Sequence, residues 1–433
     1  MRIILTFFIT LFLAPPAFTA ELTSALDQNM NGVMSKVIDW RHHFHQFPEL
    51  SNREYKTQKS IADALTEMGL EPNLDYGITG VTAFIRGQNS GPLIALRADI
   101  DGLPVTEQLN LPFSSKEKTT YQGNEIGVMH ACGHDAHIAI LLGVASFLSQ
   151  NTDKLNGDIM LIFQPAEEGA PAGEDGGAEL MLKQGLFELE KPDAIFGLHV
   201  SNFSHGTIML KPGPAMASAE AFRINIEGKQ THGSRPWEGA DPIVAAFNIG
   251  TTLQTIVSRR LNLLDSQAVV SVGIMKAGTR NNIIPQHAML EGTIRTFQDS
   301  YADQIRDEIK LIAENVAAAH HATAKVDFKI YGGYPVTFND LDLSKKYGPV
   351  LKKAADGNYY EALVPRTGAE DFSFFAQQVP GLFFFLGVNP PEAESMPTNH
   401  SPYFYIDDAA LDNGVKAFVS LVEEFSVDFN KTN

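Results

Sequence analysis

Residues 130–149 read HACGHDAHIAILLGVASFLS, a group of metal-binding residue types followed directly by an apolar stretch. The second half, 136–149, is apolar on most faces, which predicts a helix buried inside a domain. The first half holds Cys132 among three histidines and an aspartate. The thiolate of Cys132 and the imidazole of His134 can turn toward one cation, because Gly133 between them has no side chain. This stretch therefore predicts a metal site at the start of a buried helix.

Cys132 is the only cysteine of the chain, so it cannot form an intramolecular disulfide. A buried structural thiol is the alternative interpretation, since free cysteine is among the most buried residue types. The ligand-type side chains around it favour the metal site.

Strands and helices alternate on both sides of this stretch. Short apolar strands are expected at 81–86, 93–98, 158–164 and 194–200, and helices at 25–46, 54–68 and 136–149. Pro48 ends the first of these helices and Gly69 the second. The alternation predicts an α/β fold, a catalytic domain whose mixed sheet is flanked by helices.

The middle of the chain follows another pattern. Strands are expected at 221–227, 268–275, 288–296 and 325–331, with helices at 241–259 and 301–319. The order β-α-β-β-α-β is the ferredoxin-like plan. We therefore expect an inserted ferredoxin-like α+β domain at 214–330. It separates catalytic segments 21–213 and 331–433, the second with helices near 343–355, 371–378 and 408–425.

The net charge and the N-terminal segment indicate which binding partners and which location to expect. A formal net charge of -18 over 433 residues argues against nucleic acid or an anionic membrane surface as a partner. Residues 1–20 combine Arg2, an apolar run at 3–13 and small residues at the end, which is typical of a signal peptide. The run is too short to span a bilayer. We expect cleavage near 18–22 and export to the periplasm or the medium.

Two acidic segments follow expected strands. RADIDGLP (97–104) places Asp99 and Asp101 where ligands collect in α/β sheets. They could bind metal, support its ligands or only cap a turn. QPAEEG (164–169) carries Glu167 and Glu168, and neighbouring side chains of extended chain point to opposite sides. One glutamate could ligate a metal while the other acts as general base, and a solvated acidic loop is the alternative.

The remaining polar motifs mean little alone. His199 in GLHV (197–200) closes a buried strand and by itself fits a core histidine. His400 lies in a loop far along the chain. His232, Asn282 and Arg295 are polar groups at strand ends of the inserted domain.

In their order along the chain, these motifs together resemble the M20 metallopeptidase clan. The motifs are RHHFHQFPELS (41–51), RADIDGLP (97–104), HACGHDAH (130–137), QPAEEG (164–169), GLHV (197–200), HGSRP (232–236), NNIIP (281–285), TGAEDF (367–372) and NHSP (399–402). The closest similarity is to the amidohydrolase branch, which contains hippurate, N-acyl-amino-acid and indole-acetyl-amino-acid hydrolases. So many motifs in the right order make the resemblance specific.

The resemblance implies a site with two divalent metal ions, which could be zinc, manganese, cobalt or nickel. The implied ligands are Cys132 in the bridging position, His134, Glu168, His199 and His400. Glu167 matches the general base of the family. Asp101 matches an aspartate that orients a metal-binding histidine, and we do not expect Asp99 to be a ligand.

The resemblance also implies that the inserted domain is a lid or dimerisation domain, and it gives roles to three of its residues. His232 matches a histidine that reaches into a partner subunit's site to stabilise the oxyanion, which implies a homodimer. Asn282 and Arg295 match residues that hold the substrate carboxylate. His42, His45 and His137 receive no role.

The expected function is metal-dependent hydrolysis of the amide bond of N-acyl amino acids such as acetyl, benzoyl or aryl-acetyl conjugates. Glu167 would activate the water. One alternative is an exported carboxypeptidase or dipeptidase of the same family. Another is a metal-dependent binding protein without turnover.

Overall fold

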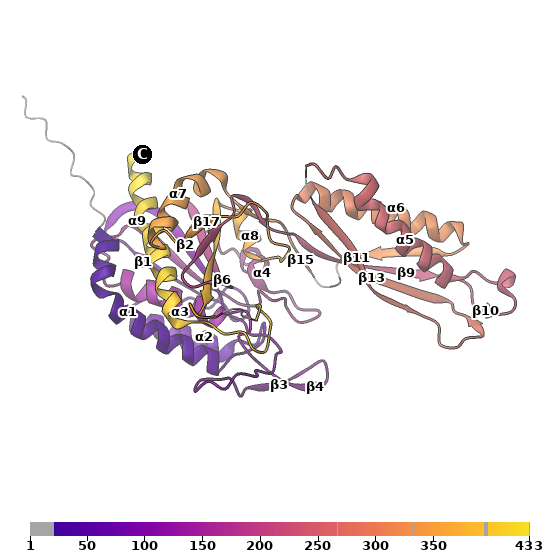
Figure 1. Ribbon diagram of the computed structural model, residues 1–433, viewed down its shortest axis with the longest axis horizontal. Helices are drawn as coiled ribbons and strands as arrows, with labels where there is room; N and C mark the ends of the chain where they lie inside the picture. The colour runs from indigo at the N-terminus through magenta and orange to yellow at the C-terminus, as the bar shows by residue number, and fades with distance from the viewer. Residues whose placement is uncertain (1–20, 266, 329, 331, 394–396, 433) are drawn as a thin grey trace, which may run out of the picture.

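The computed structural model of the protein describes residues 21–265, 267–328, 330, 332–393 and 397–432. The expected signal peptide, 1–20, lies outside these residues. Figure 1 shows a larger part that holds both ends of the described chain and an elongated second part that projects from it. Within the described ranges, no helix combines the length and the hydrophobicity that a bilayer crossing requires.

A mixed sheet forms the centre of the larger part, which confirms the predicted fold class. Its strands, in spatial order, are β1 (Val81–Arg86), β5 (Asn156–Gln164), β2 (Asn89–Asp99), β6 (Ala194–Ser204), β18 (Gly381–Asn389), β7 (Ile208–Leu210) and β17 (Tyr359–Glu361). β5, β2, β6 and β18 are parallel, whereas β1 and β7 run antiparallel to their neighbours β5 and β18. The loops that follow the parallel strands therefore meet at one edge of the sheet.

Helices cover both faces of this sheet. α1 (Glu21–Gln46), α3 (His134–Leu148) and α9 (Leu411–Thr432) pack against one another on one face. Every residue of α3 is buried, as its apolar sequence predicts. Gly143 permits the close approach of α1, since a Cβ there would lie 2.4 Å from Val37 Cγ2. On the other face, α4 (Gly177–Lys183) and α8 (Phe372–Ala376) share a core that includes Met181, Phe372 and Phe375.

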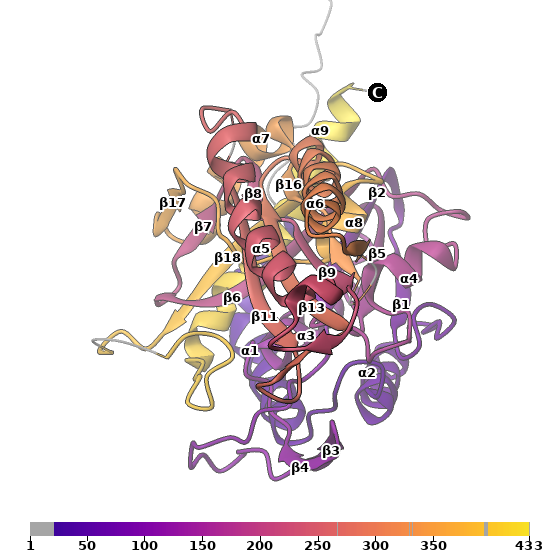
Figure 2. The same cartoon turned by 90° about the vertical axis from the view of Figure 1, so that its right-hand side faces the viewer.

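The second part is a ferredoxin-like sandwich with a core of its own. Its sheet has the order β11 (Ala268–Ala277), β13 (His287–Thr296), β9 (Ala219–Glu227), β14 (Thr323–Asp327), with antiparallel neighbours. α5 (Pro242–Arg260) and α6 (Asp299–Ala319) lie side by side over one face (Figure 2). Along the chain these elements follow the predicted β-α-β-β-α-β plan.

Two short strands join the parts. β8 (Gly213–Met216) leads into the second part, β16 (Thr337–Asn339) leads out of it, and the two pair with each other. The exact boundaries at 214 and 330 stay predictions. The remaining elements are α2 (Tyr55–Glu67), β3 (Lys118–Tyr121), β4 (Asn124–Gly127), β10 (Thr231–His232), η1 (Pro236–Glu238), β12 (Ile283–Ile284), β15 (Gly333–Tyr334), α7 (Leu341–Ala354) and η2 (Asp408–Ala410).

The observed elements differ from the expected ones in several places, of which 325–331 and β18 are two. The strand expected at 325–331 ends at Asp327, and β15 resumes the pairing with β9 a few residues later. Tyr331 itself lies outside the described residues. β18 has no counterpart among the expected strands, although its apolar run at 382–386 between Gly381 and Gly387 is typical of a strand buried on both faces.

Candidate metal centre and active site

The turn that precedes α3 places Cys132 and His134 side by side. Gly133 adopts the left-handed region with φ of 100°, which favours glycine. A Cβ at Gly133 would lie 2.2 Å from Val200 Cγ2, so the turn packs against β6 without room for a side chain. His134 then begins the helix and is completely buried. The structure thus contains the turn between Cys132 and His134 that Gly133 was expected to permit.

Residues distant in sequence gather around the Cys132 thiol. Cys132 Sγ lies 3.3 Å from His199 Nε2 and 3.2 Å from His400 Nε2. His400 Nε2 lies 3.1 Å from Glu168 Oε1, and His134 Nε2 lies 3.9 Å from the same oxygen. The five residues matched to metal ligands therefore form one cluster. His199 comes from the middle of β6, beyond the part of that strand that pairs with β2, and His400 from the loop between β18 and α9.

The two glutamates approach this cluster together. Their segment forms a turn that begins at Ala166, whose φ of 54° is left-handed, and not the extended chain expected from the sequence. Because of this turn both carboxylates face the same histidine: Glu167 Oε2 lies 3.8 Å from His134 Nε2, close to the 3.9 Å of Glu168 Oε1. The two glutamates differ in what surrounds them and not in the side to which they point.

Asp101 holds both the histidine and the turn. Its Oδ1 lies 3.2 Å from His134 Nδ1. Its carboxylate also accepts hydrogen bonds from the backbone N–H groups of Glu167 and Glu168 and from the Ser51 hydroxyl. Burial opposes ionisation, but hydrogen bonding and charge from His134 outweigh it and lower the pKa of Asp101. Asp101 is thus placed to orient His134, as expected.

Asp99 and His137 brace the neighbouring strands. Asp99 Oδ1 pairs with His137 Nδ1, and Asp99 Oδ2 accepts from Arg97 at 2.7 Å. His137 Nε2 accepts the backbone N–H of Val200 at 2.8 Å. Both nitrogens of His137 are therefore used, so His137 joins α3 to β6 and has no lone pair free for a cation.

The other two unassigned histidines lie behind the cluster. His45 Nδ1 lies 2.9 Å from Asp135 Oδ2, which also accepts from Arg41 Nε at 3.2 Å. His42 pairs with Asp408 at 2.7 Å. The contacts of Asp135 fix the start of α3 against α1, and the pair of His42 with Asp408 fixes η2 against α1.

A buried carboxyl group from the C-terminal segment completes the surroundings of Glu167. Oxygens of Glu370, Asp99 and Glu167 lie within 4.8 Å of one another. Burial and the charges of Glu370 and Glu168 raise the pKa of Glu167 well above its usual range. Burial raises the pKa of Glu370 to about 8. The motif TGAEDF was noted in the sequence, but nothing in its spacing showed that Glu370 would contact a glutamate two hundred residues away.

The donor set fits a cation. His134 Nε2 is buried and forms no hydrogen bond with another described residue. His199 Nδ1 lies 2.6 Å from the Val200 carbonyl and donates to it, which leaves the Nε2 lone pair facing Cys132 Sγ. Burial and nearby carboxylates raise the pKa of Cys132, a cost that a bound cation would reverse. Buried thiol, imidazole and carboxylate groups at this spacing are a metal-binding arrangement.

Comparison with known proteins identifies the family. The family described as Peptidase family M20/M25/M40 matches residues 95–424. The chain belongs to this family. It is 38% identical over 398 residues to the N-acetyl-L-cysteine deacetylase of Bacillus subtilis, covering 91% of this chain and 88% of that protein. It is 36% identical over 408 residues to Thermostable carboxypeptidase 1 of Saccharolobus solfataricus, covering 94% and 99%.

A solved structure agrees with this assignment. The Bacillus subtilis YXEP protein, described as a dinuclear metal binding peptidase from the M20 family, superposes with a TM-score of 0.74 at 36% identity. The alignment covers 92% of this chain and 99% of that one. The resemblance inferred from the motifs is confirmed, and with it the classification as a metal-dependent hydrolase of the M20 family.

Three predicted M20 site residues lie in the second part, away from the cluster. His232 is exposed on β10, and its Nδ1 accepts from the Ser234 hydroxyl at 2.8 Å. Asn282 is exposed beside β12, where its carbonyl accepts the Gly233 N–H. Figure 1 shows β10 at the far end of this part, well separated from β6. Within one chain, neither residue meets the metal-binding cluster.

Arg295 lies apart from both His232 and Asn282. It lies near the end of β13, whereas Asn282 precedes the start of that strand. At about 3.4 Å per residue, the strand from His287 to Arg295 alone spans roughly 27 Å. Asn282 and Arg295 therefore lie at opposite ends of β13 in one chain, and their expected role in holding the substrate carboxylate stays a prediction.

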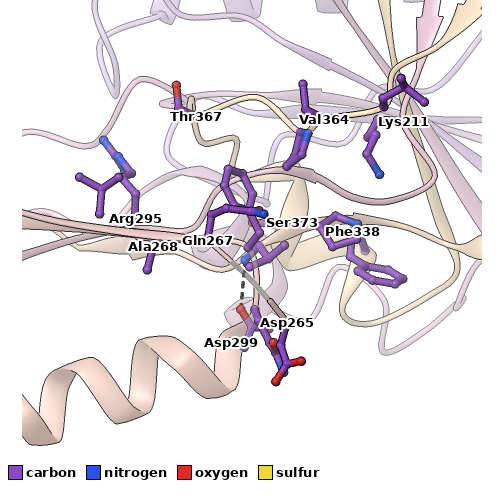
Figure 3. A pocket seen from close by; sticks show the side chains of 18 of the residues that line it. Lys211, Asp265, Gln267, Ala268, Arg295, Asp299, Phe338, Val364, Thr367 and Ser373 are labelled. Carbon is purple, nitrogen blue, oxygen red and sulfur yellow. Dashed lines mark hydrogen bonds between the residues drawn. The ribbon is translucent and has the colours of Figure 1, made fainter. Parts of the chain in front are cut away.

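Arg295 instead lines a cavity between the two parts (Figure 3). The cavity has a volume of about 1040 Å³. Its walls include Gln267 and Asp299 from the second part and Val364 and Thr367 from the larger part. None of the five clustered residues lines it.

Proposed function

We propose that this chain hydrolyses the amide bond of N-acyl amino acids and that the five clustered residues hold two divalent cations. The observation that carries the proposal is the convergence of Cys132, three histidines and Glu168 beside a second buried carboxylate, Glu167. Cys132 Sγ faces two imidazoles from different segments, which suits a bridging ligand. The chemistry that such cations supply when bound is an acidified water and a polarised carbonyl.

Glu167 is the proposed general base. It lies next to the ligand Glu168 but forms no part of the sulfur-centred group, and its oxygen comes within 3.8 Å of His134 Nε2. A carboxylate at this place can take the proton of the attacking water and give it to the leaving amine. Asp101 assists by fixing the imidazole of His134 and the backbone of the Glu167 turn.

The exposed residues of the second part fit a site that two subunits share. His232 and Asn282 lie at the far end of the second part, so in a homodimer the partner subunit's His232 and the partner subunit's Asn282 would complete the site. His232 would stabilise the oxyanion. Arg295, at the opposite end of its strand, would approach the substrate carboxylate from its own chain when the cavity between the parts closes.

A second candidate is a carboxypeptidase or dipeptidase. The similarity to Thermostable carboxypeptidase 1 favours it, since the alignment spans nearly the whole of both chains. The same cluster can hydrolyse a peptide bond. The two candidates differ in whether the group on the acyl side carries an amine.

A substrate panel separates them. Metal-free protein is reconstituted with Zn, Mn, Co or Ni and assayed on acetyl, benzoyl and indole-acetyl amino acids and on dipeptides with the same C-terminal residue. We expect release of free amino acid from the N-acyl compounds, with dipeptides hydrolysed at least about tenfold less efficiently, a difference of about 1.4 kcal/mol in transition-state binding. Preference for dipeptides would favour the second candidate. No turnover with any metal would support a binding protein.

A further inference from the structure

Arg366 is a cation near a predicted metal ligand for which the described residues supply no carboxylate partner. Arg366 Cζ lies 5.0 Å from the ring centre of Phe203 and 4.7 Å from that of Phe385. Its Nη1 is buried and forms no hydrogen bond with another described residue. Burial lowers the pKa of Arg366. A partly buried cation therefore lies over the Phe203 and Phe385 rings, and among the described residues no carboxylate is paired with it.

The register of the large sheet connects this group to the metal centre. His199 on β6 pairs with Phe385 on β18, Phe385 pairs with Met209 on β7, and Met209 pairs with Tyr360 on β17. Paired residues of adjacent strands point to the same face. The His199 and Phe385 rings are 6.2 Å apart, centre to centre. His199, Phe385, Met209 and Tyr360 thus form one row of side chains, the aromatic row, which begins at a predicted metal ligand. The guanidinium group of Arg366 lies over the Phe385 ring of this row.

The backbone fixes the direction in which Arg366 points. Its N–H donates to the Ala215 carbonyl, and its own carbonyl accepts from Ala217, so the segment is tied to β8 and to the residue that follows it. Pro365 and Thr367, on either side, line the cavity that contains Arg295 (Figure 3 labels Thr367). Arg366 does not line that cavity and turns to the aromatic row. Residues 365–367 therefore lie between two arginine side chains: Arg295 lines the cavity, and Arg366 contacts the aromatic row.

Burying a charge without a partner is costly, and guanidinium remains charged at any physiological pH. Stacking on aromatic rings offsets only part of that cost. The unused N–H donors are suited to a planar carboxylate, which binds guanidinium through two parallel hydrogen bonds.

We propose that Arg366 binds a carboxylate of the substrate. The inference rests on the proposed function, because it takes N-acyl amino acids as substrates. The carboxylate comes either from the amino acid or from the far end of a dicarboxylic acyl group such as succinyl. In either case Arg366 is a specificity-determining residue within the catalytic part, independent of Arg295.

The test compares wild type with Arg366→Met and Arg366→Lys on three matched substrates. N-butyryl-alanine carries only the amino-acid carboxylate, N-succinyl-alanine adds one at the acyl end, and N-butyryl-alaninamide carries none. Arg366→Met should lower kcat/KM, mainly through KM, by roughly 10- to 100-fold on the substrate whose carboxylate it binds. The uncharged substrate should change by less than about threefold, since it makes no such contact. Arg366→Lys should restore part of the loss.

The pattern identifies the carboxylate. A loss confined to N-succinyl-alanine places it at the acyl end, and an equal loss on both charged substrates places it on the amino acid. Equal loss on all three substrates, or no loss on any, would overturn the proposal. Circular dichroism and metal content of each variant provide the control for folding.

Product inhibition gives a measurement that does not need turnover of the uncharged compound. The ratios of inhibition constants for succinate against butyrate and for alanine against alaninamide are compared in wild type and Arg366→Gln. A change in one ratio supports the proposal, and two unchanged ratios contradict it. If wild type hydrolyses no N-acyl amino acid at all, the proposed function fails, which is a different outcome from equal losses in an active enzyme.

Discussion

The larger part and the inserted part of this chain present their polar residues in opposite ways. In the larger part, Glu168 follows the parallel strand β5, His199 lies on β6 two residues beyond its last pair with β2, and Cys132 precedes α3, so the three meet near the carboxyl ends of β2 and β5. In the inserted part the strands are antiparallel, so successive strand ends lie at opposite edges, and Asn282 and Arg295 are far apart. The first arrangement concentrates ligands within one chain. The second presents separate groups to other surfaces.

The largest expected effect tests whether Glu167, a buried residue of the larger part, is essential for the reaction. Glu167→Gln removes the proposed base but keeps the shape of the side chain. We expect kcat to fall about 10³-fold, within the usual range for a lost general base, with metal content unchanged. Steady-state kinetics and atomic emission measure both quantities.

Glu179→Gln is the matched control, because Glu179 is an exposed glutamate on nearby α4. It should leave kcat near that of wild type. Near-normal turnover of Glu167→Gln would remove Glu167 from the mechanism. Loss of metal from the same variant would make Glu167 a ligand.

The second effect concerns stability, and it compares a buried ion pair of the larger part with a more exposed ion pair of the inserted part. Arg41 is 1% exposed and bridges Asp135 and Asp408, whereas the Arg306 side chain is 33% exposed and pairs with Glu220. Arg41→Met should lower the free energy of unfolding by about 3–5 kcal/mol, because the buried Asp135 loses its permanent cation and keeps only His45 beside it. Arg306→Met should cost about 1 kcal/mol or less. Urea unfolding followed by circular dichroism measures both, and equal losses would contradict the contrast.

The smallest effect concerns the exposed residues and the proposed homodimer. His232→Ala should lower kcat by about 10²-fold if the imidazole stabilises the oxyanion in a partner's site. Mixing His232→Ala with Glu167→Gln, under conditions that exchange subunits, should then give activity well above that of either variant alone. In such a mixed dimer, one site has both Glu167 and the partner subunit's His232. Absence of any recovery after demonstrated exchange would place His232 outside the site.

The sequence predicts features that depend on local geometry or on strand direction. The Gly133 turn is local, and the ends of parallel strands meet by rule, so the cluster around Cys132 follows from motif order. The contact of Glu370 with Glu167 and that of Arg366 with the Phe385 ring depend on how a distant segment crosses the sheet. No spacing along the chain encodes that crossing.

Secondary structure shows the same limit. The ferredoxin-like plan is readable because each element is amphipathic and locally bounded. The turn at Ala166 cannot be predicted in this way, since its left-handed φ occurs at a residue other than glycine. Hydrogen bonds to the distant Asp101 and Glu54 hold the backbone of this turn. The side-chain directions of Glu167 and Glu168 therefore could not be inferred from the alternation of extended chain.

The pairing of β8 with β16 makes the inserted part a removable module. Met216 and Thr337, where the chain enters and leaves, are register partners in that ladder. Antiparallel partners of this kind can be joined by a two-residue hairpin turn. Excision of the intervening segment would join two neighbouring ends without stretching the backbone, and the same proximity makes this the natural point for grafting a different insert onto the α/β scaffold.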